Sequence, residues 1–238
     1  MATKEKTQAV SVVSDQLPAH ASHGTGAGNE NVGASDMLIP RLKLLQDLSP
    51  EIKKSKPEYV EGAEAGMIFN TVTKKLSTEI LAINLYYDHE YVLFRNRDFG
   101  GGFHGSFPDE ASAFAEAVKL AGNEEQARTL FDIAESGRHT IGIIDPESGE
   151  ISPAIMEFTS TKLRVSAQWN TDINASGGDR FSSAWKISVK EQTNTKGSFY
   201  NYSITRLGFV TDEIYQQAKE KYEQIRDSYA ANKVKVSE

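Results

Sequence analysis

The sequence has no cysteine among its 238 residues, and this absence excludes several classes of protein. Without thiols there are no disulfides, no cysteine-ligated zinc or iron–sulfur clusters and no thiol nucleophile. Long apolar runs are also missing, so we expect no transmembrane helix and no contact with a membrane. The first 13 residues lack the apolar stretch of a secretory signal. We therefore expect an intracellular protein.

Signatures of catalysis are missing as well. The five histidines do not occur at HxxxH or HxH spacing, so we expect no metal site. The sequence contains no GxSxG, HExxH or Walker motif. Asp145, at the end of a predicted strand, is a single carboxylate without a second one to complete a nuclease site. We therefore expect a binding protein without a cofactor and not an enzyme.

The net charge of −7 is unevenly distributed along the chain. Residues 108–150 contain ten acidic and three basic side chains, whereas residues 153–210 contain four acidic and seven basic ones. Binding of a polyanion depends on the field at one face and not on the total charge. The later block therefore remains a candidate for contact with nucleic acid.

Composition divides the chain into three parts. Residues 1–36 contain no Phe, Trp or Tyr and are predicted to be a disordered tail. Residues 37–210 are predicted to form one domain, with an acidic helical insertion at 109–136. Residues 211–238 are predicted to form a C-terminal helix and a short tail.

Hydrophobic periodicity and turn residues predict strands and helices within this domain. We expect a tight hairpin turn at Asp88-His89, a polar loop over 170–179 and a strand hairpin around 192–197. Strands are expected at 66–73, 79–87, 90–97, 139–144, 153–158, 184–191 and 198–207, and helices at 109–121, 124–136, 162–169 and 213–231. This order predicts an α+β fold, with an antiparallel curled sheet or a small barrel of the oligonucleotide-binding (OB) type, a helical insertion and a C-terminal helix.

Aromatic and basic residues alternate in the last third of the domain and in one earlier strand. Single-stranded nucleic acid binds to such surfaces because bases stack on rings while Lys and Arg contact phosphates. The alternative is that the rings form the core of the sheet, where aromatic residues are common. The candidate nucleic-acid-binding residues are Tyr91, Arg95, Arg97, Lys162, Arg164, Trp169, Trp185, Lys186, Tyr200, Tyr202 and Arg206.

Several short motifs resemble those of a known family. They are Leu38-Ile39-Pro40-Arg41-Leu42-Lys43-Leu44-Leu45-Gln46, Ser49-Pro50-Glu51, Tyr59-Val60-Glu61-Gly62-Ala63 with Gly66, Phe158-Thr159-Ser160-Thr161-Lys162-Leu163, Trp169-Asn170, and Lys196-Gly197-Ser198-Phe199-Tyr200-Asn201. Over roughly residues 37–225 the chain resembles tailed-bacteriophage proteins that are often labelled single-stranded DNA-binding proteins with an OB-like core. Unlike many single-strand binders, this chain does not end in an acidic tail.

The resemblance implies a protein of the host cytoplasm that coats and protects phage DNA during replication or recombination, without sequence specificity. The implied partners are single-stranded DNA and phage replication or recombination proteins, and self-association is left open. Two alternatives remain at this point: a structural or assembly protein of the virion, and a metal-dependent nuclease.

We predict that deleting residues 1–36 leaves the melting temperature nearly unchanged, because this segment has little apolar surface to bury. A thermal melt followed by circular dichroism tests this. A large fall in the melting temperature would show that the segment packs on the domain.

Overall fold

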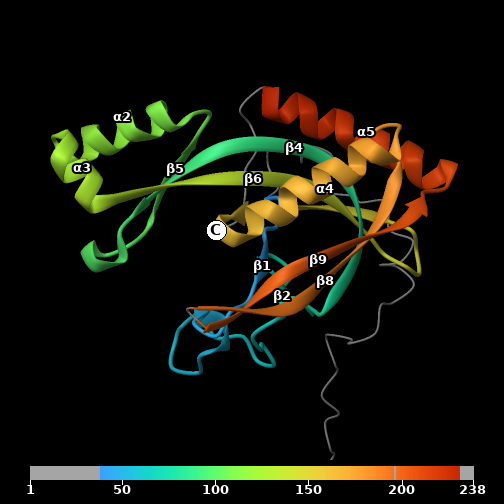
Figure 1. The fold of residues 1–238 in the computed structure, drawn as a ribbon. Helices are drawn as coiled ribbons and strands as arrows, with labels where there is room; N and C mark the ends of the chain where they lie inside the picture. Colours follow the sequence, from blue (N-terminus) through green and yellow to red (C-terminus); the bar gives the residue numbers. More distant parts are fainter. Residues whose placement is uncertain (1–37, 196, 231–238) are drawn as a thin grey trace, which may run out of the picture.

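The computed structural model describes residues 38–195 and 197–230, which form two antiparallel β-sheets and four α-helices (Figure 1). The predicted tail at residues 1–36 lies outside the described residues. The larger sheet has the strand order β7-β6-β4-β8-β9, with β5 added on β4, and the smaller sheet has the order β1-β2-β3. The larger sheet is curved and open, because its outer strands β7 and β9 do not pair (Figure 1). The α+β prediction is confirmed in its curled-sheet form.

The strands and helices have the following bounds. The smaller sheet contains β1 (Leu42–Leu44), β2 (Ile68–Asn70) and β3 (Leu76–Ser77). The larger sheet contains β4 (Glu79–Arg95), β5 (Phe103–Phe107), β6 (Phe131–Ile144), β7 (Ile151–Thr159), β8 (Ser183–Asn194) and β9 (Gly197–Phe209). The helices are α2 (Glu110–Ala121), α3 (Glu124–Leu130), α4 (Leu163–Ser176) and α5 (Asp212–Ala230), with short 3₁₀ turns η2 (Pro50–Ile52), η3 (Arg97–Phe99) and η4 (Ser160–Lys162).

Strand β4 is the centre of the larger sheet. It pairs with β6 along most of its length, with β8 near its start and with β5 near its end. The predicted hairpin turn at Asp88-His89 is wrong, because these two residues pair with Arg138 and Gly137 of β6 and continue the ladder. The polar pair lies within a strand whose partner holds it in extended conformation, so composition alone misplaced the turn.

Two predicted helix boundaries also differ from the structure. The helix predicted at 124–136 ends at Leu130, because Phe131 takes extended backbone angles and pairs with Arg95 of β4. The helix predicted at 162–169 continues to Ser176, so most of the expected loop at 170–179 is helical. Its extra turns are polar on the solvent side and bury Ile173 in the same cluster as Trp169.

The β8–β9 hairpin and the helix α5 agree with the prediction. Both depend on local signals: alternating residues around a polar turn in the hairpin, and a stripe at helical spacing in α5. Ala218 and Ile225 of that stripe are buried. None of the helices in the described ranges is long and apolar enough to cross a bilayer.

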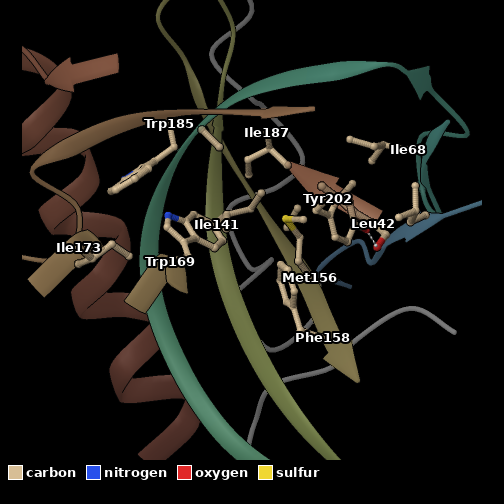
Figure 2. Packing of buried hydrophobic residues seen from close by; sticks show 13 residues of the cluster. Leu42, Ile68, Ile141, Met156, Phe158, Trp169, Ile173, Trp185, Ile187 and Tyr202 are labelled. Atoms are coloured by element: carbon tan, nitrogen blue, oxygen red, sulfur yellow. Dashed lines mark hydrogen bonds between the residues drawn. The ribbon is translucent and has the colours of Figure 1, made fainter. Parts of the chain in front are cut away.

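The larger sheet is covered on both faces. Consecutive residues of a strand point to opposite faces, and Ala82 and Ile83 of β4 belong to different buried clusters. The Ala82 cluster includes Trp169 and Ile173 of α4, with side chains from β1, β7, β8 and β9 (Figure 2). The Ile83 cluster includes residues of α5. Helices α4 and α5 therefore pack on opposite faces of the sheet.

A buried polar chain connects α4 to the sheet. Arg180 Nη1 donates to Asn84 Oδ1 at 3.0 Å, which leaves the Asn84 amide nitrogen to donate to His139 Nδ1 at 2.8 Å. His139 therefore carries its proton on Nε2, which donates to Ser166 Oγ of α4 at 2.7 Å. Burial lowers the pKa of His139 well below its ordinary value, and the charge of Arg180 acts in the same direction.

Glu90 is a second buried titratable group with the opposite behaviour. Its carboxylate lies 2.7 Å from Arg138 Nη2, and burial raises its pKa to about 7. Arg138 opposes this rise, whereas the nearby carboxylates of Glu157 and Asp88 add to it. The two buried groups therefore give opposite pH dependences of stability over the same range.

We predict that Glu90→Gln makes the melting temperature fall more steeply than in the wild type as the pH is lowered from about 7.5 to about 5.5. Below its ordinary pKa of about 6.5, His139 gains a proton only in the unfolded chain, so acid destabilises the fold. In the wild type, Glu90 gains a proton in the folded state between about pH 7 and its ordinary pKa, which offsets this loss.

Thermal melts at several pH values test this expectation. The control is Glu147→Gln, which removes an exposed carboxylate and is expected to keep the wild-type slope. Parallel curves for wild type and Glu90→Gln would contradict the assignment of Glu90.

Candidate nucleic-acid interface

Three of the predicted stacking rings lie in the core. Trp169, Trp185 and Tyr202 are each about 1% exposed (Figure 2). The Trp169 ring stacks on His139 with centroids 4.7 Å apart, and the Tyr202 hydroxyl donates to the Leu42 carbonyl at 3.4 Å. These rings offer no free face to a base, and their position agrees with the alternative that the aromatic residues form the core.

The predicted residues of the earlier strand, Tyr91, Arg95 and Arg97, lie at or just after the end of β4. Tyr91 is partly buried there, Arg95 is exposed, and Arg97 begins η3. Leu93, which strand alternation puts on the same face as Tyr91, is fully buried in a cluster with residues of α2 and α3. The helices therefore cover part of the surface that was predicted to meet a nucleic-acid strand.

Two further predicted cations already have partners. Lys186 Nζ lies 3.8 Å from a carboxylate oxygen of Glu79. The Arg206 guanidinium lies over the Phe209 ring at 4.4 Å, and its Nε donates to Ser183 Oγ at 3.1 Å. These two basic residues are thus used within the β8–β9 hairpin and its neighbour β4.

The other predicted residues, Lys162, Arg164 and Tyr200, come together in one place. A hollow of about 380 Å³ lies between the chain at 159–162 and the start of β9 at 197–200. A second hollow of about 420 Å³ lies between α4 and the strands β8 and β9, and the two share Thr161. We call these two adjoining hollows together the α4–β9 groove. Its lining residues include Gln46, Ser160, Lys162, Ser198, Phe199 and Tyr200 in the first hollow, and Arg164, Gln168, Lys190, Gln192 and Asn201 in the second.

Gln46 ties the first hollow together, although it was not among the predicted site residues. Its amide nitrogen donates to the Tyr200 carbonyl and its amide oxygen accepts from the Tyr200 N–H, both at 2.9 Å. The side chain thus pairs with the strand as a neighbouring strand would. Gly66 approaches the same residue so closely that a Cβ there would lie 2.8 Å from the Tyr200 ring.

The motifs that carried the resemblance therefore meet around the groove. Gln46 and Gly66 come from the motifs between residues 38 and 66, Lys162 from the motif at 158–163 and Tyr200 from the motif at 196–201. More than 150 residues separate Gln46 from Tyr200 along the chain. Nothing in the spacing of these motifs reveals that contact, which forms only when β1 and β9 approach each other.

The electrostatics of the groove favour an anion. Lys162, Arg164 and Lys190 line it, and within residues 38–195 and 197–230 none of the three forms an ion pair. Burial lowers the pKa of Lys162, an effect that the carboxylate of Glu157 opposes. Ser160, Thr161 and Lys162, which lead into α4, line the first hollow, so the positive end of the helix dipole also lies at the groove. Asp172 is the acidic residue among the lining side chains.

Comparison with known proteins now gives the family. Residues 5–231 match the family described as Pam3 phage gp34-like protein. The chain belongs to this family. No curated protein and no solved structure matches it. The predicted origin from a bacteriophage is confirmed, while the family description states no activity.

The described part of this phage protein holds no group of three or more His, Cys, Asp or Glu side chains placed to bind a metal. The groove offers three cations, amide side chains, and the half-buried rings of Phe199 and Tyr200.

We predict that Trp169→Ala lowers the free energy of unfolding by about 3–5 kcal/mol, because it leaves a cavity between α4 and the sheet. Arg164→Ala, at an exposed position of the same helix, is expected to change it by less than about 0.5 kcal/mol. Urea titrations followed by circular dichroism measure both. A Trp169→Ala protein with wild-type stability would contradict the core position of this ring.

Proposed function

We propose that this phage protein binds single-stranded DNA in the α4–β9 groove, without base specificity, and so coats and protects phage DNA during replication or recombination in the host cytoplasm. The observation that carries the proposal is that three cations without ion pairs among the described residues, Lys162, Arg164 and Lys190, line one groove. Because phosphates recur along a strand, several cations suit it better than a single cation does.

Two features of the groove favour a single strand over a duplex. Phe199 and Tyr200 are half-buried beside Lys162, so a base can reach a ring only if it is not paired in a helix. Amide and hydroxyl side chains, including Gln168, Gln192 and Ser198, provide hydrogen bonds that every base or sugar can use. Contacts of this kind support binding that tolerates any sequence.

The overall charge of the protein does not oppose this proposal. The acidic residues of α2 and α3 lie at the far end of the β4–β6 ribbon, away from the β8–β9 hairpin (Figure 1). At physiological salt, exposed charges separated by more than about 8 Å are largely screened from each other. A strand in the groove therefore meets the local cations more than the distant carboxylates.

We predict that a fluorescein-labelled oligothymidine binds the full-length protein and that its affinity falls as the salt concentration rises. Arg164→Ala and Lys190→Ala should each reduce the slope of log affinity against log salt by about 0.7, because each removes one contact to a single-strand phosphate. Fluorescence anisotropy at several salt concentrations measures the slope.

Lys119→Ala is the matched control, because it removes an exposed cation of α2 outside the groove and should leave the slope unchanged. A competition with unlabelled duplex of the same length tests the strand preference. Preferential binding of duplex, or equal slopes for all three variants, would overturn the proposed function.

A further inference from the structure

A separate small module lies at the far end of the β4–β6 ribbon, and nothing in the proposed function uses it. Helices α2 and α3 pack there over the ends of β4, β5 and β6 (Figure 1). Leu93, Ala117, Ala127 and Phe131 form its buried cluster, distinct from the two clusters under α4 and α5. We call this part of the molecule, residues 91–135, the distal arm.

The distal arm contains a groove of about 810 Å³ between α2, α3 and the start of β6. The lining is partly apolar, with Phe114 and Ile133 incompletely covered by the rest of the chain. Apolar side chains are also exposed elsewhere on the arm: Phe94, Phe99, Phe103 and Leu120 are between 38% and 49% exposed. An apolar surface of this kind is typical of a site that another molecule covers.

The charges around this groove indicate what covers it. Asp109, Glu110 and Asp132 line it, all three exposed. In the described part of the chain neither Glu110 nor Asp132 forms an ion pair. Arg128 is the basic lining residue, and its guanidinium lies over the Phe114 ring at 4.4 Å.

Further acidic residues lie on the elements that form the groove. Glu124 and Glu125 occupy the exposed first turn of α3, and Glu135 is exposed on β6, where its carboxylate lies 2.9 Å from His89 Nε2. The field there is negative, so it repels nucleic-acid phosphates and attracts a cationic partner. The occupant must therefore combine positive charge with an apolar side chain.

We propose that the groove on the distal arm docks a lysine- or arginine-rich segment of a partner protein, anchored by one apolar side chain between α2 and β6. The apolar anchor reaches Phe114 and Ile133, while flanking cations meet Glu110 and Asp132. In this proposal the two ligands bind at different places, because DNA binds the basic α4–β9 groove and the partner binds the acidic groove on the distal arm.

The test uses the full-length protein and two fluorescein-labelled synthetic peptides. One peptide carries three lysines on each side of a leucine, and the other has serine in place of leucine. The leucine peptide should bind about tenfold more tightly, because burying a leucine side chain is favourable whereas burying a serine is not. Fluorescence anisotropy at moderate salt measures both affinities.

Substitutions in and outside the groove locate the binding. The double variant Glu110→Gln with Asp132→Asn should weaken the leucine peptide about fivefold. The control, Glu147→Gln with Glu150→Gln, removes two exposed carboxylates from the turn between β6 and β7 and should leave the affinity unchanged. Ala111→Trp fills the groove from an exposed position of α2, so it should abolish the preference for leucine without disturbing the buried cluster.

Three results would overturn the proposal. Equal affinity for the two peptides would show that no apolar side chain is anchored in the groove. Equal losses of affinity in the two double variants would show that the peptide responds only to the total charge of the protein. Self-association of the protein alone, lost in Ala111→Trp, would assign the groove to a second copy of this chain. Oligothymidine binding is measured in parallel. The variants lie outside the α4–β9 groove, so loss of peptide binding with intact oligothymidine binding concerns only the distal arm, and absence of oligothymidine binding concerns only the proposed function.

Discussion

The attachment of α4 to the larger sheet is the interaction on which the α4–β9 groove depends. Trp169 stacks on His139 of β6, and His139 donates to Ser166 one turn earlier in the helix. Gly137 makes this approach possible, because a Cβ there would lie 2.6 Å from Ser166 Oγ. A single buried imidazole therefore fixes both the height and the rotation of the helix that forms one wall of the groove. Its neutral form is required, since Asn84 occupies its Nδ1 as a donor.

Opposite charges occupy separate places in this molecule. Three basic side chains that form no ion pair with the described residues, Lys162, Arg164 and Lys190, line the α4–β9 groove, and the acidic helices lie on the distal arm. The net charge of −7 therefore does not describe the local charge of either region. Two buried titratable groups also carry little uncompensated charge. Glu90 pairs with Arg138, and His139 stays uncharged beside Arg180.

Local patterns predicted the elements whose partners are nearby in sequence. The β8–β9 hairpin and the stripe of α5 depend on such patterns, and both agree with the structure. Strand β4 was divided at Asp88-His89, because its continuity depends on pairing with β6, about 50 residues away. Alternation puts Tyr200 and Tyr202 on the same face of β9, but only the contacts of Tyr202 with Leu42 of β1 and Phe158 of β7 show that Tyr202 is buried while Tyr200 stays half-buried at the groove. The role of Gln46 had no local signal, since a side chain that pairs with a strand looks like any other glutamine.

Strand β4 runs for 17 residues without interruption and joins the two halves of the molecule. At about 3.3 Å per residue its path is on the order of 55 Å long, and it curves along this path while paired with β6 (Figure 1). The part of the sheet that forms the groove lies at one end of β4, and the acidic helices lie at the other end. If copies bind along a DNA strand, as the proposed function implies, each copy holds its acidic helices at the same distance from that strand, and β4 sets this distance.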